Sequence, residues 1–374
     1  MRRAAAGVAI GALALGLCAA PIGAAPFTFI VYGDSRAGEK CAGNAVHMNL
    51  VRRMAAVEPA FVVNTGDMIT GFAPTTNFVT RGTCTASDTT GSLKEIIAPL
   101  QERRPPAGLP MAYFPVIGNH DDGWGSKWYP DSNRDGICDV FDLRSLVPNH
   151  TRKPYFRSKR RASLTDAAFH DLLCSKTEQR IYPHFAYYSF DHGGVHFVVL
   201  RVNMNSFDLE TCRKCRDQAD YDDYYNVHQL HWLEADLEAA RKDPATRAIF
   251  VFLHAPVFGS GDRHGNTPSW KRLAGLFTQH RVSAVFSGHA HVYERSVPIV
   301  VDGAAPEGVR DDGRGTFYVT TGGGGATLHG FRAQPWYAEV RRSTFHYVEV
   351  QVDGNRMKLR AVDAAGKVID EASR

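Results

Sequence analysis

Several apolar runs in this 374-residue chain end in residues that commonly bind metal ions. The polar residues that follow these runs are Asp34, Asp67, Asn119-His120, His254 and His289-x-His291. Carboxylate and amide oxygens together with imidazole nitrogens suit divalent or trivalent transition metals. The set offers more ligands than one tetrahedral ion needs, which favours two ions that share a bridging carboxylate. Such a pair polarises a phosphoryl oxygen and supplies hydroxide at neutral pH.

The runs that precede these residues are typical of buried strands. They cover residues 27–32, 61–63, 113–117, 249–253 and 282–286. Apolar residues at helical spacing predict helices over residues 46–57, 230–241 and 270–277. Apolar strands that alternate with helices indicate βαβ units with strands buried on both faces. Because the carboxyl ends of such strands open into one crevice, we expect the polar residues to meet there.

The later part of the chain has a different pattern. Residues 317–320, 345–352 and 357–362 are typical of strands, and Asp353-Gly354 is a favourable hairpin turn. We therefore expect antiparallel strands that extend the same body. Residues 123–224 resemble an insertion, although its strand-like segments 185–190 and 195–202 are expected to join the core. A single domain over residues 26–374 is the resulting interpretation.

The ordered motifs resemble those of the calcineurin-like metallophosphoesterases. The segments that carry the resemblance are Gly33-Asp34, Gly66-Asp67, Gly118-Asn119-His120-Asp121, His254 and Gly288-His289-Ala290-His291. The stretch from His254 to Arg295 is similar to the purple acid phosphatase branch of that superfamily. The resemblance implies an α/β fold, a four-layer α/β/β/α sandwich in which two mixed β-sheets pack face to face with helices outside.

The resemblance also implies two metal sites. Asp34 and His291 would hold the first ion, and Asp67 would bridge both ions. The second ion would be held by Asn119, His254 and His289. The metals would be two transition-metal ions, with iron, manganese and zinc all left open.

The remaining catalytic candidates surround this expected metal pair. By resemblance, His120 would donate a proton to the leaving alkoxide, Asp121 would orient His120, and a metal-bound hydroxide would attack phosphorus. His264 is a candidate phosphate contact. Arg36 stands where many relatives have a histidine, and we expect either a structural ion pair or a phosphate clamp there. Thr70 stands where the purple enzymes have a tyrosine, and these two departures together predict a weaker first site.

Composition sets limits on the other classes of protein. Hydrophobic residues make up 44% and charged residues 22%, with a net charge of +4, which argues against disorder and against a nucleic-acid platform. Residues 1–25 carry Arg2 and Arg3 before an apolar run and small residues, a pattern typical of a signal peptide. We therefore expect a secreted or periplasmic protein with no transmembrane segment after cleavage. The oligomeric state stays open.

Two further features lie in the part of the chain that would remain after cleavage: six cysteines and a possible calcium site. Six cysteines would remain after cleavage, and their pairing into disulfides stays open: Cys41, Cys84, Cys138, Cys174, Cys212 and Cys215. The insertion also holds oxygen donors at the spacing of a calcium loop, and the alternative is a surface turn. The candidate calcium ligands are Asp131, Asn133, Asp135, Asp139 and Asp142.

These observations favour a secreted, metal-dependent hydrolase of small phosphorylated substrates, with phosphomonoesters preferred. The first alternative is a phosphodiesterase of nucleotides or lipid headgroups, since the same core serves both reactions. The second alternative is a non-catalytic metal-binding protein of the cell envelope. Intact His120 argues against that last alternative, whereas Arg36 and Thr70 favour it weakly.

Overall fold

The computed structural model describes residues 25–36, 42–68, 93–109, 111–120, 187–202, 221–267 and 270–374. Side chains at the starts of three helices, residues 42–44, 93–95 and 221–228, are not described. Several predicted features lie outside the described residues. They are most of the signal segment, Thr70, Asp121, all six later cysteines and the calcium loop from Asp131 to Asp142.

Two β-sheets form the centre of the molecule. The first has the strand order β15-β14-β13-β1-β2-β3 and the second has the order β12-β8-β11-β7-β6-β5-β4. The first sheet comprises β1 (Phe27–Tyr32), β2 (Phe61–Asn64), β3 (Tyr113–Pro115), β13 (His346–Asp353), β14 (Arg356–Asp363) and β15 (Val368–Ser373). The second comprises β4 (Tyr188–His192), β5 (Val195–Val199), β6 (Ala248–Phe252), β7 (Ala284–Ser287), β8 (Tyr293–Ser296), β11 (Phe317–Thr321) and β12 (Ala338–Arg342). A small hairpin pairs β9 (Ile299–Val300) with β10 (Val309–Arg310).

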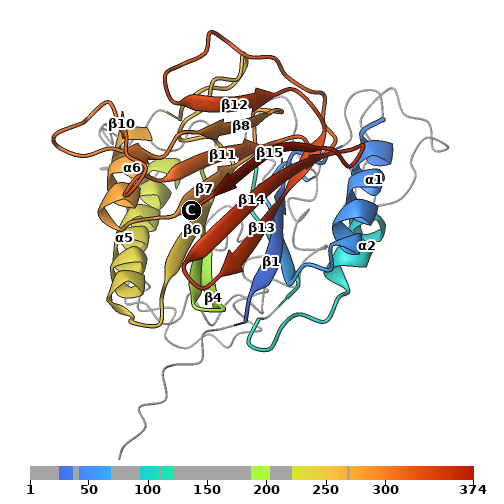
Figure 1. Cartoon of the computed structure of the whole chain (residues 1–374), viewed down its shortest axis with the longest axis horizontal. Helices are drawn as coiled ribbons and strands as arrows, with labels where there is room; N and C mark the ends of the chain where they lie inside the picture. Colours follow the sequence, from blue (N-terminus) through green and yellow to red (C-terminus); the bar gives the residue numbers. More distant parts are fainter. Residues whose placement is uncertain are drawn as a thin grey trace, which may run out of the picture.

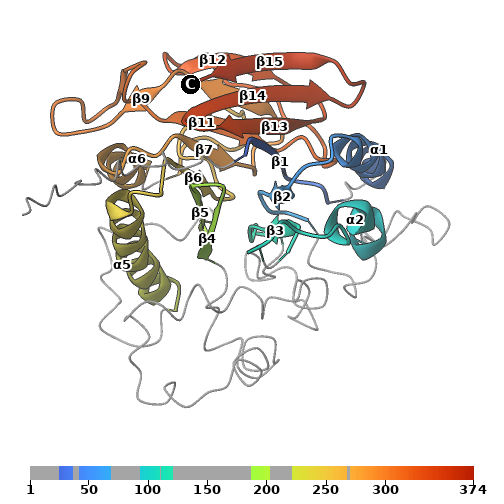
Figure 2. The same ribbon diagram turned by 60° about the horizontal axis from the view of Figure 1, so that its bottom comes forward.

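Both sheets are mixed, as the resemblance implied. Strand β1 pairs in parallel with β2 and antiparallel with β13, while β6 pairs in parallel with both β5 and β7. Helices α1 (Ala42–Ala56) and α2 (Leu93–Gln101) lie beside the first sheet. Helices α5 (Tyr221–Lys242) and α6 (Trp270–Gln279) lie beside the second, on the opposite side of the molecule (Figures 1 and 2). The predicted fold class is therefore confirmed.

Aromatic side chains fill the space between the sheets. Phe29 and Phe61 of the first sheet stack with ring centroids 5.3 Å apart, and Phe197 of the second meets Phe29 edge-on at 5.3 Å. Alternate residues of β1 point the other way, so the ring of Tyr32 lies against His47 of helix α1. Each fully buried ring contributes about 1.5–3 kcal/mol of transfer free energy. This packing holds the carboxyl ends of the parallel strands at one edge.

Most of the predicted strands and helices are present with shifts of a few residues, although α5 begins at Tyr221, well before the predicted start at residue 230. Strand β3 ends at Pro115, two residues before the predicted end, although the Val116 amide still donates to the Asn64 carbonyl at 2.8 Å. The strands β4 and β5, which lie near the end of the predicted insertion, are part of the second sheet. Helix α2 and the strands β8, β12 and β15 were not predicted. Strand β8 has the sequence YERS yet is buried, because partners elsewhere in the fold satisfy its polar side chains.

A histidine between two carboxylates ties helix α5 to the second sheet. His196 on β5 lies 2.7 Å from the Asp191 carboxylate through Nδ1 and 2.9 Å from the Asp236 carboxylate through Nε2. Burial alone would lower the pKa of His196, but the hydrogen bonds and charges of Asp191 and Asp236 raise it to about 9. The imidazolium form is therefore stabilised in the folded protein.

This raised pKa predicts a loss of stability at alkaline pH. A group with a raised folded pKa stabilises fully below its unfolded pKa of about 6.5, and that contribution disappears as pH rises through about 9. We expect the free energy of unfolding to fall by up to roughly 3 kcal/mol over this window. Urea titrations across the window should show a smaller fall in His196→Gln. Identical pH profiles for both proteins would contradict the assignment.

Candidate metal centre

The loops after five parallel strands bring the candidate ligands to one edge of the two sheets. Asp34 follows β1, Asp67 follows β2 and His254 follows β6. Asp34, Asp67 and His289 have left-handed backbone conformations, with φ of 56°, 54° and 65°. Such conformations cost about 1–3 kcal/mol each in non-glycine residues and concentrate at functional sites. The turns therefore aim these side chains at a common point at the expense of local strain.

The first group of possible ligands consists of Asp34, Asp67 and His291. Their ligand atoms lie within 4.8 Å of one another, and all three residues are buried. The Nε2 atom of His291 is 3.3 Å from Oδ1 of Asp34. Its other ring nitrogen, Nδ1, donates to the Thr327 carbonyl at 2.6 Å. This second hydrogen bond leaves Nε2 with a free lone pair directed at the carboxylates.

The second group consists of Asp67, His254 and His289, and Asn119 lies beside it. The Nε2 atom of His254 is 3.3 Å from Oδ1 of Asp67, 3.2 Å from Nδ1 of His289 and 3.1 Å from Oδ1 of Asn119. The Nδ1 atom of His254 donates to the Thr65 carbonyl at 2.8 Å. The structure thus brings together all six residues predicted as metal ligands, and Asp67 belongs to both groups.

The chemistry of the donors and the shape of the cradle fit two metal ions. Oδ1 of Asp34 and Nε2 of His289 are buried and have no hydrogen-bond partner among the described residues. A side chain at Gly118 would place its Cβ 2.3 Å from Oδ1 of Asp67, and one at Gly288 would lie 2.5 Å from Oδ2 of Asp34. Glycine is therefore required at both positions. Mixed carboxylate, amide and imidazole donors suit first-row transition metals.

The opposite charges within the cluster shift the pKa values of Asp67 and His254 in the direction opposite to the effect of burial. Burial alone would raise the pKa of Asp67, but His254, His120 and Arg36 hold the pKa of that carboxyl well below its usual range. Burial alone would lower the pKa of His254, and the carboxylates of Asp67 and Asp34 raise it to about 9. Without a metal ion, a proton on His254 helps to balance the carboxylates. Cations bound at the same place would replace this proton.

His120 and Arg36 both contact the shared carboxylate. The His120 amide donates to Oδ1 of Asp67 at 2.9 Å, and its Nε2 lies 3.8 Å from Oδ2 with 32% of the side chain exposed. Nε of Arg36 lies 3.4 Å from the same Oδ2. Burial lowers the pKa of His120 and Arg36 adds to this, against the opposing effect of Asp67. The ion pair expected as one role of Arg36 is therefore present.

A wall of histidines borders the two groups. The ring of His264 lies 3.8 Å from that of His289 between centroids, so the candidate phosphate contact lies at the second group. His329, which was not predicted, stacks on His291 with centroids 3.9 Å apart. The only sequence signal for His329 is its position just after the glycine run 322–325. That run closes over the first group, since the Ala326 amide donates to the Asp34 carbonyl at 2.9 Å.

Comparison with known proteins now places the chain. A family model described as calcineurin-like phosphoesterase matches residues 29–293. The chain belongs to this family. The match runs from β1 to the start of β8 and so includes every predicted metal ligand of the phosphoesterase.

A named relative agrees with this placement, and two solved structures share the fold. Purple acid phosphatase 22 of Arabidopsis thaliana is 33% identical over 178 residues, which cover 46% of this chain and 35% of that protein. A purple acid phosphatase structure from yellow lupin seeds has a TM-score of 0.57 at 16% identity, covering 94% of this chain and 54% of that one. The anchor of the Plasmodium inner membrane complex has a TM-score of 0.54 at 14% identity, with 93% and 88% covered. The phosphoesterase thus matches about a third of the length of its curated relative.

Among the helices in the described ranges, none is both long and apolar enough to cross a bilayer.

Proposed function

We propose that this phosphoesterase is a secreted hydrolase of phosphoric esters that uses two metal ions and favours phosphomonoesters. The observation that carries the proposal is the pair of buried Asp/His groups sharing Asp67, with His120 half-exposed beside them. Two bound transition-metal ions polarise a phosphoryl oxygen and supply hydroxide at neutral pH. The relatives named as acid phosphatases support the choice of monoesters.

The protein side chains have separate tasks in this proposal. Asp34, Asp67 and His291 would hold one ion, and Asp67, Asn119, His254 and His289 would hold the other. The side chain of His120 is 32% exposed beside Asp67, so its imidazolium can donate a proton to the alkoxide that leaves phosphorus. His264 lies next to His289, where its ring can contact a phosphate oxygen.

Assays with chromogenic monoesters and diesters test the proposal directly. We expect the manganese-, iron- or zinc-reconstituted protein to hydrolyse the monoester faster, and His120→Ala to lower kcat by roughly 100-fold or more, as loss of a general acid does. His192→Ala, at the opposite edge of the sheets, is a matched control. A faster rate on diesters would favour the phosphodiesterase alternative.

A non-catalytic role is the second candidate. The fold is also similar to that of a protein described as an anchor, and Arg36 stands where the family resemblance leads us to expect a histidine. Rates that are equal in wild type, His120→Ala and Asp67→Asn would favour this candidate and would end the enzyme hypothesis.

Arg36 has a further proposed role as a clamp for the substrate phosphate. Its Nε faces Asp67, and no described residue accepts a hydrogen bond from its two Nη groups. A guanidinium that contacts phosphate contributes about 1.5–3 kcal/mol, so we expect Arg36→Ala to raise KM by roughly tenfold or more. Arg332→Ala, on an exposed neighbouring loop, should leave KM unchanged. An unchanged KM with reduced metal content would show that Arg36 only supports Asp67.

Export, disulfide formation and calcium binding are further proposals. We propose removal of residues 1–25, disulfides among the six later cysteines and calcium binding in the 131–142 loop. Mass spectrometry of the exported protein would reveal the mature N-terminus and the number of free thiols. Calcium should raise Tm in wild type but not in Asp135→Ala, and a Tm insensitive to calcium would exclude that site.

A further inference from the structure

The segment from Thr327 to His329 is held against His291 by a set of reciprocal contacts. The His291 amide donates to Nδ1 of His329 at 3.2 Å, and the His329 amide donates to the His291 carbonyl at 3.1 Å. The Thr327 carbonyl accepts the hydrogen bond from Nδ1 of His291. The two imidazole rings stack with centroids 3.9 Å apart and an interplanar angle of 17°. Both histidines are buried, at 4% and 7% exposure.

Each of these contacts fixes a different aspect of the orientation of His291. The Thr327 carbonyl determines which ring nitrogen of His291 carries the proton, so that Nε2 faces Asp34 at 3.3 Å. The χ2 torsion of histidine is broad and roughly two-fold, so one hydrogen bond at the ring edge leaves the ring plane free to tilt. The stacked ring of His329 covers one face of His291 and restricts that tilt. The backbone hydrogen bonds keep the two residues in register.

His329 is itself held in place from a third segment. The Ser343 hydroxyl donates to the His329 carbonyl at 2.7 Å, just after strand β12. Because Nδ1 of His329 accepts a hydrogen bond, its single ring proton lies on Nε2 and the ring is neutral. A neutral ring stacks on His291 without the charge repulsion that an imidazolium would bring next to a bound metal ion. The segment follows the glycine run 322–325 and Ala326, whose amide donates to the Asp34 carbonyl.

We infer that His329 is a positioning residue that holds the imidazole of His291 in the orientation needed for metal binding at the first group. The inference rests on the proposed metal centre. The first group contains one imidazole, His291, because the residue two positions after Asp34 is Arg36. An error in the orientation of that single imidazole is therefore not compensated by another ligand of its kind. Loss of such an outer partner typically lowers metal affinity by roughly 10–100-fold.

Cobalt titration of the metal-free full chain tests this role. Visible absorption and calorimetry would follow Co²⁺ binding in wild type and in His329→Ala, His329→Asn and His329→Phe. Asparagine keeps an acceptor near the position of Nδ1, and phenylalanine keeps the stacking face. We expect two ions in wild type, a loss of roughly 10–100-fold in the affinity of one ion in His329→Ala, and smaller losses in the other two variants.

Two controls separate this role from general destabilisation. His192→Ala removes a half-buried histidine that contacts Phe27 at the far edge of the sheets and should leave both cobalt affinities unchanged. Urea unfolding should show each variant folded under the titration conditions. Unchanged affinity for both ions in folded His329→Ala would overturn the inference.

The outcomes also separate this inference from the proposed function. A wild-type protein that binds two Co²⁺ ions but hydrolyses no phosphoester would contradict the proposed function. Weakened cobalt binding in His329→Ala would still support the role of His329 in that case. Active wild-type enzyme with unaltered cobalt binding in the variants would overturn the role of His329 alone. A wild-type protein that takes up no Co²⁺ would overturn both.

Discussion

Replacement of Asp67 by asparagine is expected to remove both metal ions and nearly all phosphoesterase activity. Asp67 is the one residue common to the two buried groups, and its side chain is only 2% exposed. Asparagine has the same shape but lacks the negative charge, and its amide nitrogen cannot bind a cation. The loss of activity should therefore exceed the roughly 100-fold effect of removing an outer partner of a ligand. Metal content by mass spectrometry, measured beside kcat/KM, checks both parts.

Two further measurements make this result specific. Asp353→Asn changes an exposed carboxylate at the far end of β13 and should alter neither metal content nor activity. Thermal unfolding of the metal-free proteins shows whether the Asp67→Asn protein is folded. If one ion stays bound and the rate falls less than about tenfold, Asp67 does not bridge the two sites.

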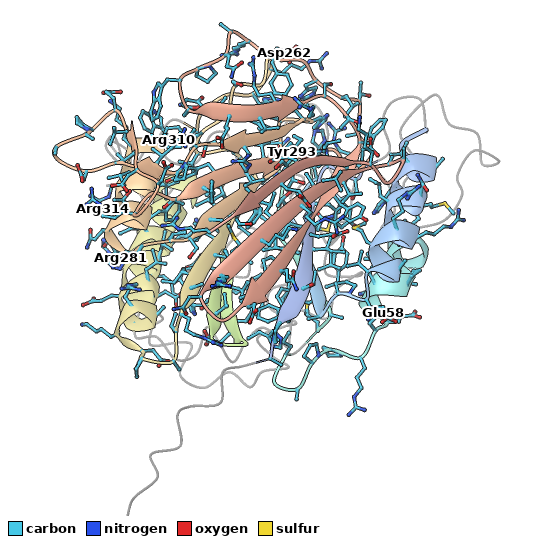
Figure 3. All side chains as sticks on the ribbon, viewed as in Figure 1. Glu58, Asp262, Arg281, Tyr293, Arg310 and Arg314 are labelled. Carbon is cyan, nitrogen blue, oxygen red and sulfur yellow. The ribbon has the colours of Figure 1, made fainter. Side chains whose placement is uncertain are left out.

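Replacement of Arg295 by alanine is expected to destabilise the fold by about 3–5 kcal/mol, because it would leave a buried carboxylate without its cation. Nε of Arg295 on β8 donates to the Asp370 carboxylate on β15 at 2.5 Å, and its Nη1 pairs with Glu339 of β12. Tyr293, labelled in the upper middle of Figure 3, donates its hydroxyl to Asp370 at 2.6 Å. The side chains of Arg295 and Asp370 are only 7% and 6% exposed. This network therefore joins the second sheet to the last strand of the first.

Guanidinium unfolding curves of three variants check the effect. The paired change Arg295→Leu with Asp370→Leu removes both charges, so it should cost less than Arg295→Ala even though the Tyr293 hydroxyl loses its acceptor. Arg360→Ala breaks ion pairs with Glu349 and Glu371, but Arg360 is 41% exposed and the cost should stay below about 1 kcal/mol. Equal losses in the free energy of unfolding for Arg295→Ala and Arg360→Ala would show that the buried network stabilises the fold no more than the exposed ion pairs do.

The position of the candidate site could be predicted because its signals are local. Each ligand follows an apolar strand, and glycines such as Gly66 and Gly288 stand directly before Asp67 and His289. The succession of strand, turn and polar residue depends only on residues that are neighbours in the chain. The strand pattern of β1, β2, β6 and β7 was likewise readable from apolar runs buried on both faces.

Other elements escaped prediction because their stability depends on distant partners. Strand β8 is polar in sequence and buried in the fold, since Glu294 accepts from the Ser260 amide and hydroxyl and Arg295 pairs with Asp370. Strand β15 is an edge strand in which half of the residues are polar, and it forms because β14 pairs with it. No local period of apolar residues marks either strand.

The sequence by itself determined the type of chemistry, the order of the ligands and the strands that carry them, because these follow from residue types and nearest neighbours along the chain. The resemblance implied the division of the ligands into two groups around Asp67, and the structure places them in that way. Only the tertiary structure decided that Arg36 pairs with this carboxylate and that His329 covers His291. Those contacts join residues that are far apart in the chain. They arise when the two sheets pack together, and no spacing along the chain records them.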